Sequence, residues 1–587
     1  MARPKTLPDN HFRLSTFRKG DHTYIYGYRN EWNPEKKQSR VAKRIYVGTL
    51  NEVTGKARLG KKYLASHPEY EGKTLYYENH ELVERNDISE DEETSMREQT
   101  HLSNNLCYGA PWALWQFAMK NGIFQHLQDA FGKEDGRNLL ALGIYQLLTG
   151  QAMSSYEDWV TQAWLPISQP LCSQRISELL SRVEHEAMMK YFHLRFNRSK
   201  DNYKKFTEQQ FKARKESLPS KPSKLYMAID STGISTFSVT IENAAFGHAK
   251  QNPELKQVNF TLGVDFLSGD VCYAREDDGS ITDKSVYKSI LMEMQNYGFD
   301  LSETVLVTDR GYSSLYNLQS LINCDVSFVA GVPMVEKGVR EKFEKYQAAL
   351  SHIAFYNSEH DVYCRTLTER FNRNSAAGSC SLESYLHLYR FPKIAAEQTA
   401  MLLKKIDKLI KDKNNGKKVD PTDWKGICKY VREDSRNHWT KDIEALSRWQ
   451  NTAGCFVIRS DYLEDPIEAL TLYRRRNIVE VAFRQFKVLN GGARLFATET
   501  TYVGKLMVHV IAQSLRMALM VQAKARESKE LRIPDNSLEK MLNSLKRIRA
   551  VRAPTRVCWV AEPISKKARD VLELLGLPNP PSTFKSI

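Results

Sequence analysis

Residues 224–232, KLYMAIDST, form a short apolar stretch that runs into a carboxylate, Asp230. Residues 304–312, TVLVTDRGY, repeat this pattern and run into Asp309. Short apolar runs bounded by polar residues predict buried β-strands. Both acids are therefore expected where a strand leaves the core, although a single acid at such a position is more often a cap or turn residue.

The sequence around these two stretches predicts one mixed sheet. A hairpin is expected at 258–274 with its turn at 267–270, helices near 282–297 and 313–322, and a strand at 326–332. The predicted order is three strands, helix, strand, helix, strand, with hairpins first and crossovers afterwards. This order predicts an α/β fold with an RNase H-like mixed sheet.

Changes in composition divide the chain into six predicted regions. A β-rich basic N-terminal region is a candidate DNA-binding sheet, although a solvated hairpin explains its charges equally well. A helical region follows, in which Arg175 would lie early in the second helix of a helix-turn-helix-like pair; such pairs are also common in proteins that do not bind DNA. A large insertion is expected to interrupt the catalytic domain, and a helical region ends the chain. The regions are 1–100, 101–222 (helical, with linker), 223–334 (catalytic, first part), 335–453 (insertion), 454–525 (catalytic, second part) and 526–587.

The composition is that of an ordinary soluble protein with a polyanionic partner. The 587 residues are 41% hydrophobic and 26% charged, and lysine plus arginine exceed the acids to give a net charge of +15. The nine cysteines are scattered and odd in number, which argues against a disulfide framework or a zinc module. No continuous run of about 18 apolar residues and no secretion signal is found, so we expect a cytoplasmic protein without a membrane span.

A third acid lies on a helix predicted from about 466 to 489. With about 100° per residue, Tyr473, Arg476, Glu480 and Lys487 form one polar stripe about 60° wide. Beside it runs an apolar stripe that can dock on the sheet, made of Leu472, Val479, Phe483 and Phe486. A solvated face with an Arg476–Glu480 pair, worth about 0.2–0.5 kcal/mol, would explain the stripe alone. Together with the two strand-end aspartates, a catalytic role for Glu480 becomes the better interpretation.

The spacing Tyr473-x-x-Arg476-x-x-x-Glu480-x-x-x-x-x-x-Lys487 resembles the Y-R-E-K signature of DDE transposases of the insertion-sequence-four type. Asp230-Ser231-Thr232 and Asp309-Arg310-Gly311-Tyr312 are similar to the family's first and second aspartate motifs. The resemblance covers about 224–525 well and the flanks weakly. The long gap between Asp309 and Glu480 and the total length are similar to the family's long-insertion prokaryotic branch.

The residue types fit metal-dependent phosphoryl transfer. Three converging carboxylates would repel one another at pH 7 unless cations neutralise them. Oxygen ligands without His or Cys favour Mg²⁺ or Mn²⁺, and two such ions can assist an in-line displacement. Arg476 and Lys487 are expected to hold DNA phosphates, Tyr473 to bind a phosphate or stack on a base. Gly311 is expected to permit a turn that brings Arg310 and Tyr312 to the rim of the cleft.

The resemblance further implies cut-and-paste transposition through a hairpin, on terminal inverted repeats and target DNA, within a synaptic homodimer. In relatives a flipped base is held against an aromatic residue of the insertion, which makes Trp424, Trp439 and Trp449 candidates. For any one of them a core position is the commoner explanation. Two other functions remain open: a DNA-binding remnant without activity, and an RNase H-like nuclease or resolvase that cuts DNA without joining it.

Overall fold

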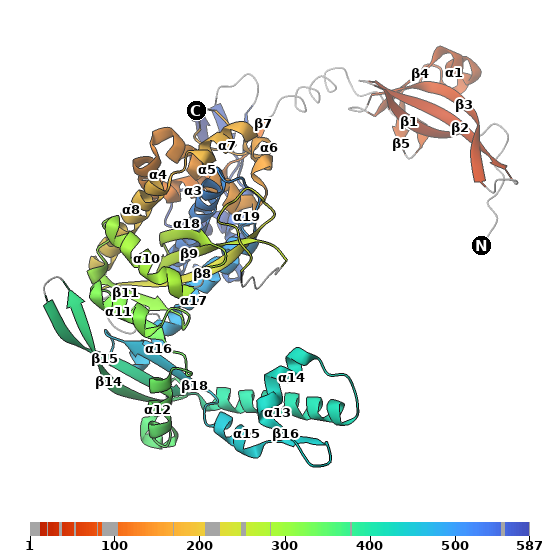
Figure 1. Ribbon diagram of the computed structural model, residues 1–587. Coiled ribbons are helices and arrows are strands. Elements are labelled where there is room, and N and C mark those ends of the chain that lie inside the picture. Colours follow the sequence, from red (N-terminus) through yellow and green to blue (C-terminus); the bar gives the residue numbers. More distant parts are fainter. Residues whose placement is uncertain are drawn as a thin grey trace. The chain divides into compact units, whose positions relative to one another are not determined.

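The computed structural model describes the chain except residues 1–11, 20–21, 34–37, 52–54, 79, 85–103, 168, 206–223, 248–253, 282, 376–377, 553–557 and 586–587. The chain divides into two units. The first comprises residues 1–105 with 551–559 and 586, and the second comprises the remainder. Each is described by itself below (Figure 1).

The first unit is built on an antiparallel sheet in the order β1-β2-β3-β4-β5-β6. Leu14, Ile25, Val47 and Ala57 form its small core. The Arg44 guanidinium lies 3.9 Å from the centre of the Tyr26 ring, and Arg44 is exposed. Lys36 and Lys37, which also belong to the basic N-terminal region, lie outside the described residues. The elements are β1 (Arg13–Lys19), β2 (His22–Asn33), β3 (Gln38–Leu50), β4 (Lys56–Leu59), α1 (Lys61–Ser66), η1 (Pro68–Tyr70), β5 (Leu75–Glu78) and β6 (Glu81–Glu84).

A helical layer follows the first unit. Its helices pack on one another and on α18 (Tyr502–Arg526), which contacts α5 and α7. Helix α7 begins at Ser173 with Cys172 at its cap position, so Arg175 lies in its first turn, as expected. The elements are β7 (Asn104–Cys107), α3 (Gly109–Lys120), α4 (Ile123–Phe131), α5 (Lys133–Thr149), η2 (Met153–Ser155), α6 (Tyr156–Val160), α7 (Ser173–Ser181) and α8 (His185–Lys204).

Helix α18 is apolar on nearly every side because it lies inside the second unit. Among the described helices it is the one long and apolar enough to cross a membrane, and 83% of its most apolar window is buried within the protein. A buried core helix meets the same length and composition criteria as a membrane span. Its burial against α5 and α7 fits the role of a core helix.

A mixed sheet forms the centre of the second unit, in the order β10-β9-β8-β11-β12-β18-β15-β14-β13, with β19 beside β8. Strands β8, β9 and β10 are antiparallel neighbours, whereas β11 runs parallel to β8 and β12 runs parallel to β11. This is the predicted succession of hairpins and crossovers. The elements are β8 (Leu225–Thr236), β9 (Gln257–Asp265), β10 (Val271–Asp278), α10 (Asp283–Asn296), η4 (Leu301–Glu303), β11 (Thr304–Thr308), α11 (Leu315–Asn323), β12 (Ser327–Gly331), β18 (Cys455–Ser460) and β19 (Arg494–Leu495).

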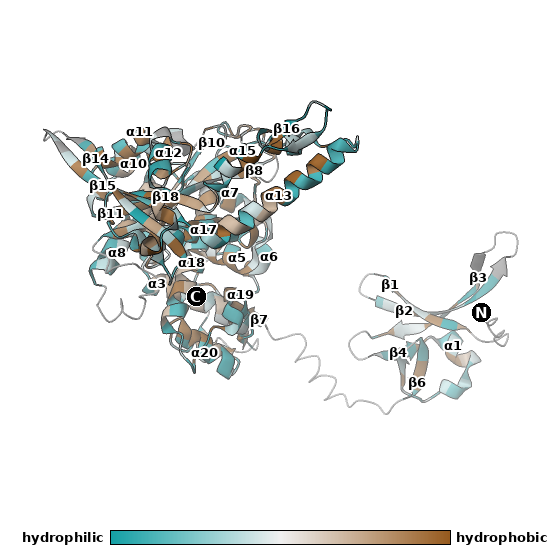
Figure 2. Cartoon of the chain, turned by 90° about the horizontal axis from the view of Figure 1, so that it is seen from below, coloured by the Kyte–Doolittle hydropathy of each residue, from teal (hydrophilic) through white to brown (hydrophobic). Residues whose placement is uncertain are grey.

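Residues 335–453, for which no strand was expected, contain a long hairpin that extends this sheet. Strands β14 and β15 pair over thirteen residue pairs, and β15 pairs with β18. A smaller helical cluster around α13 has its own core of Ile406, Leu409, Ile427, Tyr430, Val431 and Leu446, and α13 shows both apolar and polar patches (Figure 2). The elements are α12 (Lys337–Tyr346), η5 (Ala349–Ser351), η6 (Ile353–Phe355), β13 (Tyr356–Asn357), β14 (Val362–Ser375), β15 (Gly378–Arg390), α13 (Pro392–Asn414), α14 (Pro421–Ile427), η7 (Cys428–Tyr430), β16 (Val431–Glu433), β17 (Trp439–Lys441) and α15 (Ile443–Gln450).

The helix predicted at 466–489 is divided at Arg476 into α16 (Pro466–Arg475) and α17 (Asn477–Val488). Asp465 caps α16 through its side chain. The predicted apolar stripe is buried, since Leu472, Val479, Phe483 and Phe486 are all at most 6% exposed. The remaining elements are η8 (Pro534–Asn536), α19 (Leu538–Lys546), β20 (Arg549–Arg552), β21 (Cys558–Ala561), α20 (Lys566–Leu574) and β22 (Thr583–Lys585).

Candidate active site

Two neighbouring parallel strands bring the aspartates together. In the β8–β11 register Ile229 is opposite Thr308, so Asp230 and Asp309 are the next residues on adjacent strands. Asp309 directly follows β11, whereas β8 continues past Asp230 to Thr236, so the expectation that Asp230 ends a strand is wrong: the two carboxylates lie side by side where β11 alone ends. Asp230 is 19% exposed and Asp309 is 41% exposed, so solvent reaches both.

Helix α17 adds Glu480, and Arg476 lies among the three acids. Its guanidinium nitrogens are 3.5 Å from Asp230 Oδ2, 3.8 Å from Asp309 Oδ1 and 2.6 Å from Glu480 Oε1. Burial alone would lower the pKa of Arg476, but the carboxylates of Asp309, Asp230 and Glu480 outweigh burial and raise it. One guanidinium therefore links acids from two strands and one helix.

Tyr473 is held in the wall of the site. Its hydroxyl donates a hydrogen bond of 3.0 Å to Asp309 Oδ1, and its ring packs 5.1 Å from the Phe456 ring. Burial and the neighbouring Asp309 raise the pKa of Tyr473, so the hydroxyl keeps its proton at neutral pH. A Cβ at residue 331 would approach the Tyr473 hydroxyl to 2.5 Å, so Gly331 leaves the space that this hydroxyl needs.

Lys487 lies along β8 beyond the acids. Its Nζ donates to Thr232 Oγ1 at 2.8 Å and to the Gly233 carbonyl at 2.7 Å. The sequence interpretation included Thr232 in the first aspartate motif but gave it no contact with Lys487. Period-two alternation could have identified it, because Thr232 and Asp230 lie on the same face of β8.

Arg310 and Tyr312, both expected at the rim, have different environments. Arg310 is exposed, with its guanidinium 6.0 Å from the centre of the Phe456 ring. Tyr312 is only 1% exposed and packs 5.2 Å from the Tyr287 ring, in the core. The expectation that Tyr312 lies at the rim of the cleft, where it could bind DNA, is wrong: its ring is buried, and the chain turns here through a hydrogen bond from Ser313 N–H to the Arg310 carbonyl before α11 begins at Leu315.

The other predicted side chains lie on separate elements. Arg175 is exposed on α7, where it bonds to Gln169 Oε1 at 3.1 Å. Trp424 and Trp439 stack edge-to-face at 4.8 Å in the helical cluster around α13, with Lys413 Nζ over both rings, and Trp449 lies 6.3 Å from the Tyr430 ring. All three tryptophans are half-buried and pack against the core of this cluster.

The donor set of the site fits a hard divalent cation. Carboxylate oxygens without thiolate or imidazole are the ligands that Mg²⁺ and Mn²⁺ prefer. In the described part of the chain, no three His, Cys, Asp or Glu side chains are close enough together to hold an ion as they stand. At this site the Arg476 guanidinium lies among the three carboxylates, so a metal would have to compete with it for them.

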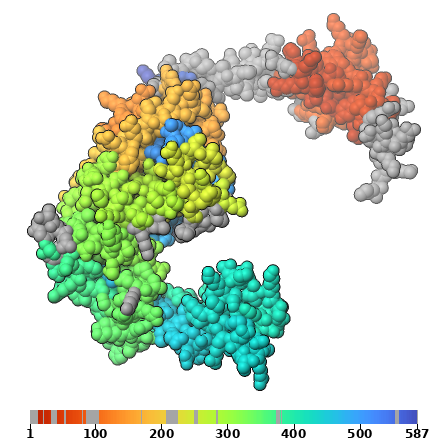
Figure 3. Space-filling model, viewed as in Figure 1, coloured from red at the N-terminus to blue at the C-terminus, as the bar shows by residue number. Residues whose placement is uncertain are grey.

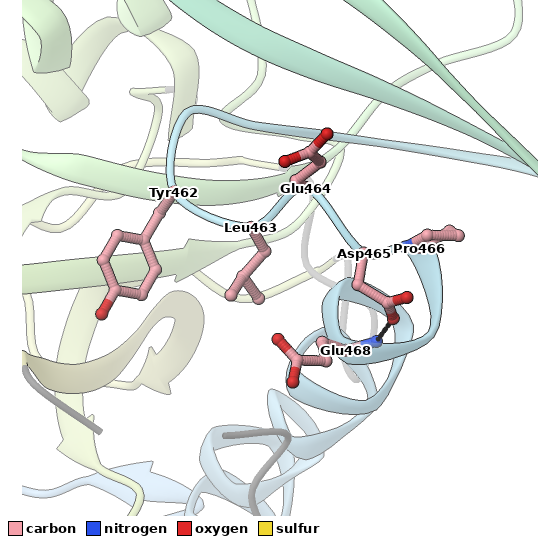
Figure 4. Close-up of a pocket in the computed structure, with 6 residues that line it drawn as sticks. All are labelled: Tyr462, Leu463, Glu464, Asp465, Pro466 and Glu468. Carbon is pink, nitrogen blue, oxygen red and sulfur yellow. Dashed lines mark hydrogen bonds between the residues drawn. The ribbon is translucent and has the colours of Figure 1, made fainter. Parts of the chain in front are cut away.

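The hollow beside the start of α16 has different chemistry. This depression of about 650 Å³ is lined by Tyr462, Leu463, Glu464, Asp465, Pro466 and Glu468 (Figure 4). Asp465 is occupied as a helix cap, accepting from the amides of Ile467 and Glu468 at 2.8 Å. Three carboxylates in one hollow disfavour the approach of a phosphate, so it is not a DNA-phosphate site.

Comparison with known proteins identifies the family. A model of the transposase DDE domain matches residues 221–515, about half of the 587 residues. Among solved structures, a chain in the cryo-EM structure of the piggyBac transposase synaptic complex with hairpin DNA is similar at 11% identity and a TM-score of 0.30, over 60% of this chain and 57% of that chain. Comparison with curated proteins gives no match. The segment matched by the family model contains Asp230, Asp309 and Glu480, and the chain belongs to the family of transposases that carry a DDE domain.

Proposed function

We propose that the chain is an active cut-and-paste transposase, which cuts DNA and joins it to a new site by phosphoryl transfer at Asp230, Asp309 and Glu480. One observation carries the proposal: three solvent-accessible carboxylates, one on β8, one directly after β11 and one on α17, surround a single guanidinium. Arg310 and Lys487 add positive charge beside them. A cluster of acids next to fixed cations suits a reaction on an anionic backbone.

The sheet supports an RNase H-like catalytic domain. In the order β10-β9-β8-β11-β12 the first strand, β8, lies centrally, and the acids lie on it and on its parallel neighbour. Ligands of mixed and parallel sheets bind at the carboxyl ends of such strands. The hairpin β14–β15 and the helical cluster around α13 lie between β12 and β18 in sequence, as expected for an insertion into that domain.

Two Mg²⁺ or Mn²⁺ ions held by Asp230, Asp309 and Glu480 would supply activation of the attacking oxygen and charge stabilisation of the leaving one. The chain's own cations would position the DNA. Arg476 presents a planar fork that can bind a phosphate in two places, and Lys487 a point charge further along β8. The attacking groups would be water in the first cut and a DNA 3′-hydroxyl in later steps.

The hairpin route and the partners belong to the same proposal. The three tryptophans around α13 are half-buried rather than fully enclosed, which leaves them as candidates for stacking on a base. Stacking on an aromatic ring stabilises an unpaired base by about 1–3 kcal/mol, which offsets the cost of unstacking. We propose terminal inverted repeats and target DNA as substrates, and a homodimer as the synaptic state.

The test is cleavage of a labelled duplex that carries the element's end, taken from the DNA flanking the gene, with Mg²⁺, with Mn²⁺ and without metal. Metal-dependent nicking followed by a hairpin product is expected. Glu480→Gln removes the acid on α17 and should abolish both products. Glu344→Gln is the matched control, because Glu344 is also exposed and also bonds an arginine four residues away, at 2.9 Å.

The possible outcomes separate the alternatives. Tight, specific binding of the end without cleavage under either metal would overturn the enzyme and leave a DNA-binding remnant. Cleavage without joining of the cut end to a target plasmid would point to a nuclease or resolvase. Equal cleavage by Glu480→Gln and Glu344→Gln would remove Glu480 from the mechanism.

A further inference from the structure

Two exposed phenylalanines form a stacked pair at the far end of β8. Phe237 is 53% exposed and Phe496 is 62% exposed, and their ring centres lie 5.9 Å apart at an interplanar angle of 25°. The pair lines a hollow of about 780 Å³. Neither ring contributes much to the core, and exposed aromatic clusters commonly mark binding surfaces.

The pair is connected directly to the candidate active site. Phe237 follows β8, the strand that carries Asp230 seven residues earlier. Leu495, beside Phe496 in sequence, pairs with Thr236 at the end of β8. Lys487 contacts β8 between these points, at Thr232 and Gly233. At about 3.3 Å per strand residue, Phe237 lies roughly 20 Å from the acids along β8.

Cations and hydroxyl groups surround the rings. The Arg494 guanidinium lies 5.2 Å from the centre of the Phe237 ring, and Lys505 Nζ lies 6.0 Å from that of Phe496 while bonding the Phe496 carbonyl at 2.8 Å. One acid, Glu178, also lines the hollow. The hydroxyl-bearing residues of its wall are Ser177, Ser181, Ser238, Thr498, Thr500 and Thr501.

This combination matches the chemistry of single-stranded nucleic acid. Aromatic faces stack on any base, cations attract the backbone, and small hydroxyls and a carboxylate can bond base edges. A binding site for a protein partner would be expected to have a wider apolar surface, without cations over its aromatic rings. The 5.9 Å spacing is too short to admit a base between the rings, which needs two stacking steps of about 3.4 Å. A base would therefore stack on an outer face of the pair.

We propose that Phe237 and Phe496 form a stacking platform for unpaired nucleobases of the DNA strand that runs from the acids past Lys487. The inference rests on the proposed function and adds a contact site to it. A distance of roughly 20 Å corresponds to about six nucleotides if the strand keeps the stacked B-form rise of about 3.4 Å each, and to fewer if it is extended. The strand could come from the element's end or from the target. In Figure 3 the yellow segment that follows β8 lies at the surface beside blue residues of the later chain.

The platform can be tested by binding alone, in the Asp230→Asn background, so that no cleavage is needed. One probe is the end duplex with a single-stranded extension that carries 2-aminopurine four to eight nucleotides from the cleavage point. The other is a target duplex with an unpaired stretch labelled in the same way. Quenching of 2-aminopurine is expected in one of the two probes, which identifies the source of the strand.

Phe237→Ala and Phe496→Ala should each lose that quenching and weaken binding by about 5- to 100-fold, whereas Phe237→Trp should retain both. Tyr316→Ala is the matched control, because Tyr316 is 64% exposed with Lys288 Nζ 5.7 Å from its ring centre and does not line this hollow. Thermal melting checks that each variant is folded.

The outcomes of this test distinguish the platform from the proposed function. Binding and quenching that are unchanged in both alanine variants would overturn the platform but leave the proposed function intact. A changed oligomeric state with unchanged DNA binding would make the pair a protein contact and would also overturn it. If the parent protein binds neither probe, the proposed function itself fails.

Discussion

Arg459 and Arg476 each hold more than one carboxylate, but in opposite environments. Arg459 on β18 is 3% exposed, with its Nε 2.7 Å from Glu369 Oε2 and its NH2 nitrogen 3.2 Å from Glu336 Oε1. Arg476 is 12% exposed, and two of its three acids, Asp309 and Glu480, are 41% and 50% exposed. The same type of ion cluster is thus buried around Arg459 and exposed to solvent around Arg476.

The two arginines differ in whether their carboxylate partners can bind another cation or anion instead. Glu369 also contacts Lys342, but its side chain is only 9% exposed, so removing Arg459 would leave a buried charge incompletely paired, a state that costs several kcal/mol. Around Arg476 the acids face solvent, so water, a metal or a phosphate can take over either side of the pair at small cost. Burial, more than residue type, therefore separates a structural ion cluster from one suited to chemistry.

The largest expected effect is loss of catalysis in Asp230→Asn. Removing one of three carboxylates should lower DNA cleavage by on the order of 10³-fold or more. Stability should change by less than about 1 kcal/mol, because Arg476 keeps Asp309 and Glu480 as partners. Single-turnover cleavage and urea unfolding measure the two quantities. A large loss of stability with residual cleavage would place Asp230 with the structural cluster.

The second prediction concerns the buried cluster. Arg459→Met leaves Glu336 without this cation and Glu369 with Lys342 alone, and it should destabilise the fold by about 3–5 kcal/mol. Arg340→Met, which breaks the exposed pair with Glu344, should cost at most about 0.5 kcal/mol. Both are measured by urea unfolding. Equal and small losses would mean that burial does not distinguish the two arginines.

The third prediction is a pH dependence from His387 on β15. Burial lowers the pKa of His387 to about 4, below its usual 6.5, and its ring nitrogens bond the Thr366 hydroxyl and the Leu463 carbonyl. As pH falls from 6.5 to 4 the unfolded chain binds a proton that the folded chain does not, so stability is lost across this window. From pH 7.5 to 4.5 this loss should be about 2–3 kcal/mol.

His387→Gln removes this contribution. Between pH 7.5 and pH 4.5 the unfolding free energy of the variant should therefore decrease by about 2–3 kcal/mol less than that of the parent protein. Burial raises the pKa of Asp461 and of Asp277 to about 6, which acts in the opposite direction. Those groups are present in both proteins and cancel in the difference. Parallel pH profiles for parent and variant would contradict the predicted burial of a neutral His387.

The sequence was informative where a strand is buried on both faces. Residues 225–229 are apolar, residues 304–308 are apolar except for Thr304 and Thr308, and all of them are buried in β8 and β11, so their pattern predicts two strands. That β8 continues past Asp230 to Thr236 was not predicted. Strands β14 and β15 were not predicted. Much of β14 is half-exposed, and both strands mix charged and apolar residues, so neither shows a clear hydrophobic period.

Tertiary contacts explain the remaining differences. The sequence placed Tyr312 after a glycine turn but could not show that the Asn317 side chain bonds the Tyr312 carbonyl at 3.0 Å, where the chain enters α11. It placed Arg476 on the polar stripe with Glu480. That Arg476 contacts all three acids depends on the helix being divided there and on the docking of α17 against β8 and β9. A helical projection of the sequence shows neither the division of the helix nor its docking on the sheet.

The smallest expected effect tests whether Arg476 and a divalent cation compete for the same carboxylates. In Arg476→Gln the three acids lose a positive charge at 2.6 to 3.8 Å, so the cluster becomes more negative. Partly exposed charges at this range interact by on the order of 1 kcal/mol, so Mn²⁺ affinity of the DNA-free protein should rise about fivefold. Cleavage should fall, because the same side chain is expected to hold a phosphate. Electron paramagnetic resonance of free Mn²⁺ measures the affinity, with Arg340→Gln as the control for loss of one exposed arginine. Tighter Mn²⁺ binding with weaker cleavage would show that Arg476 competes with the metal for the carboxylates before DNA binds and holds a phosphate beside the metal afterwards. Arg459 is buried with its carboxylates and cannot change partners in this way.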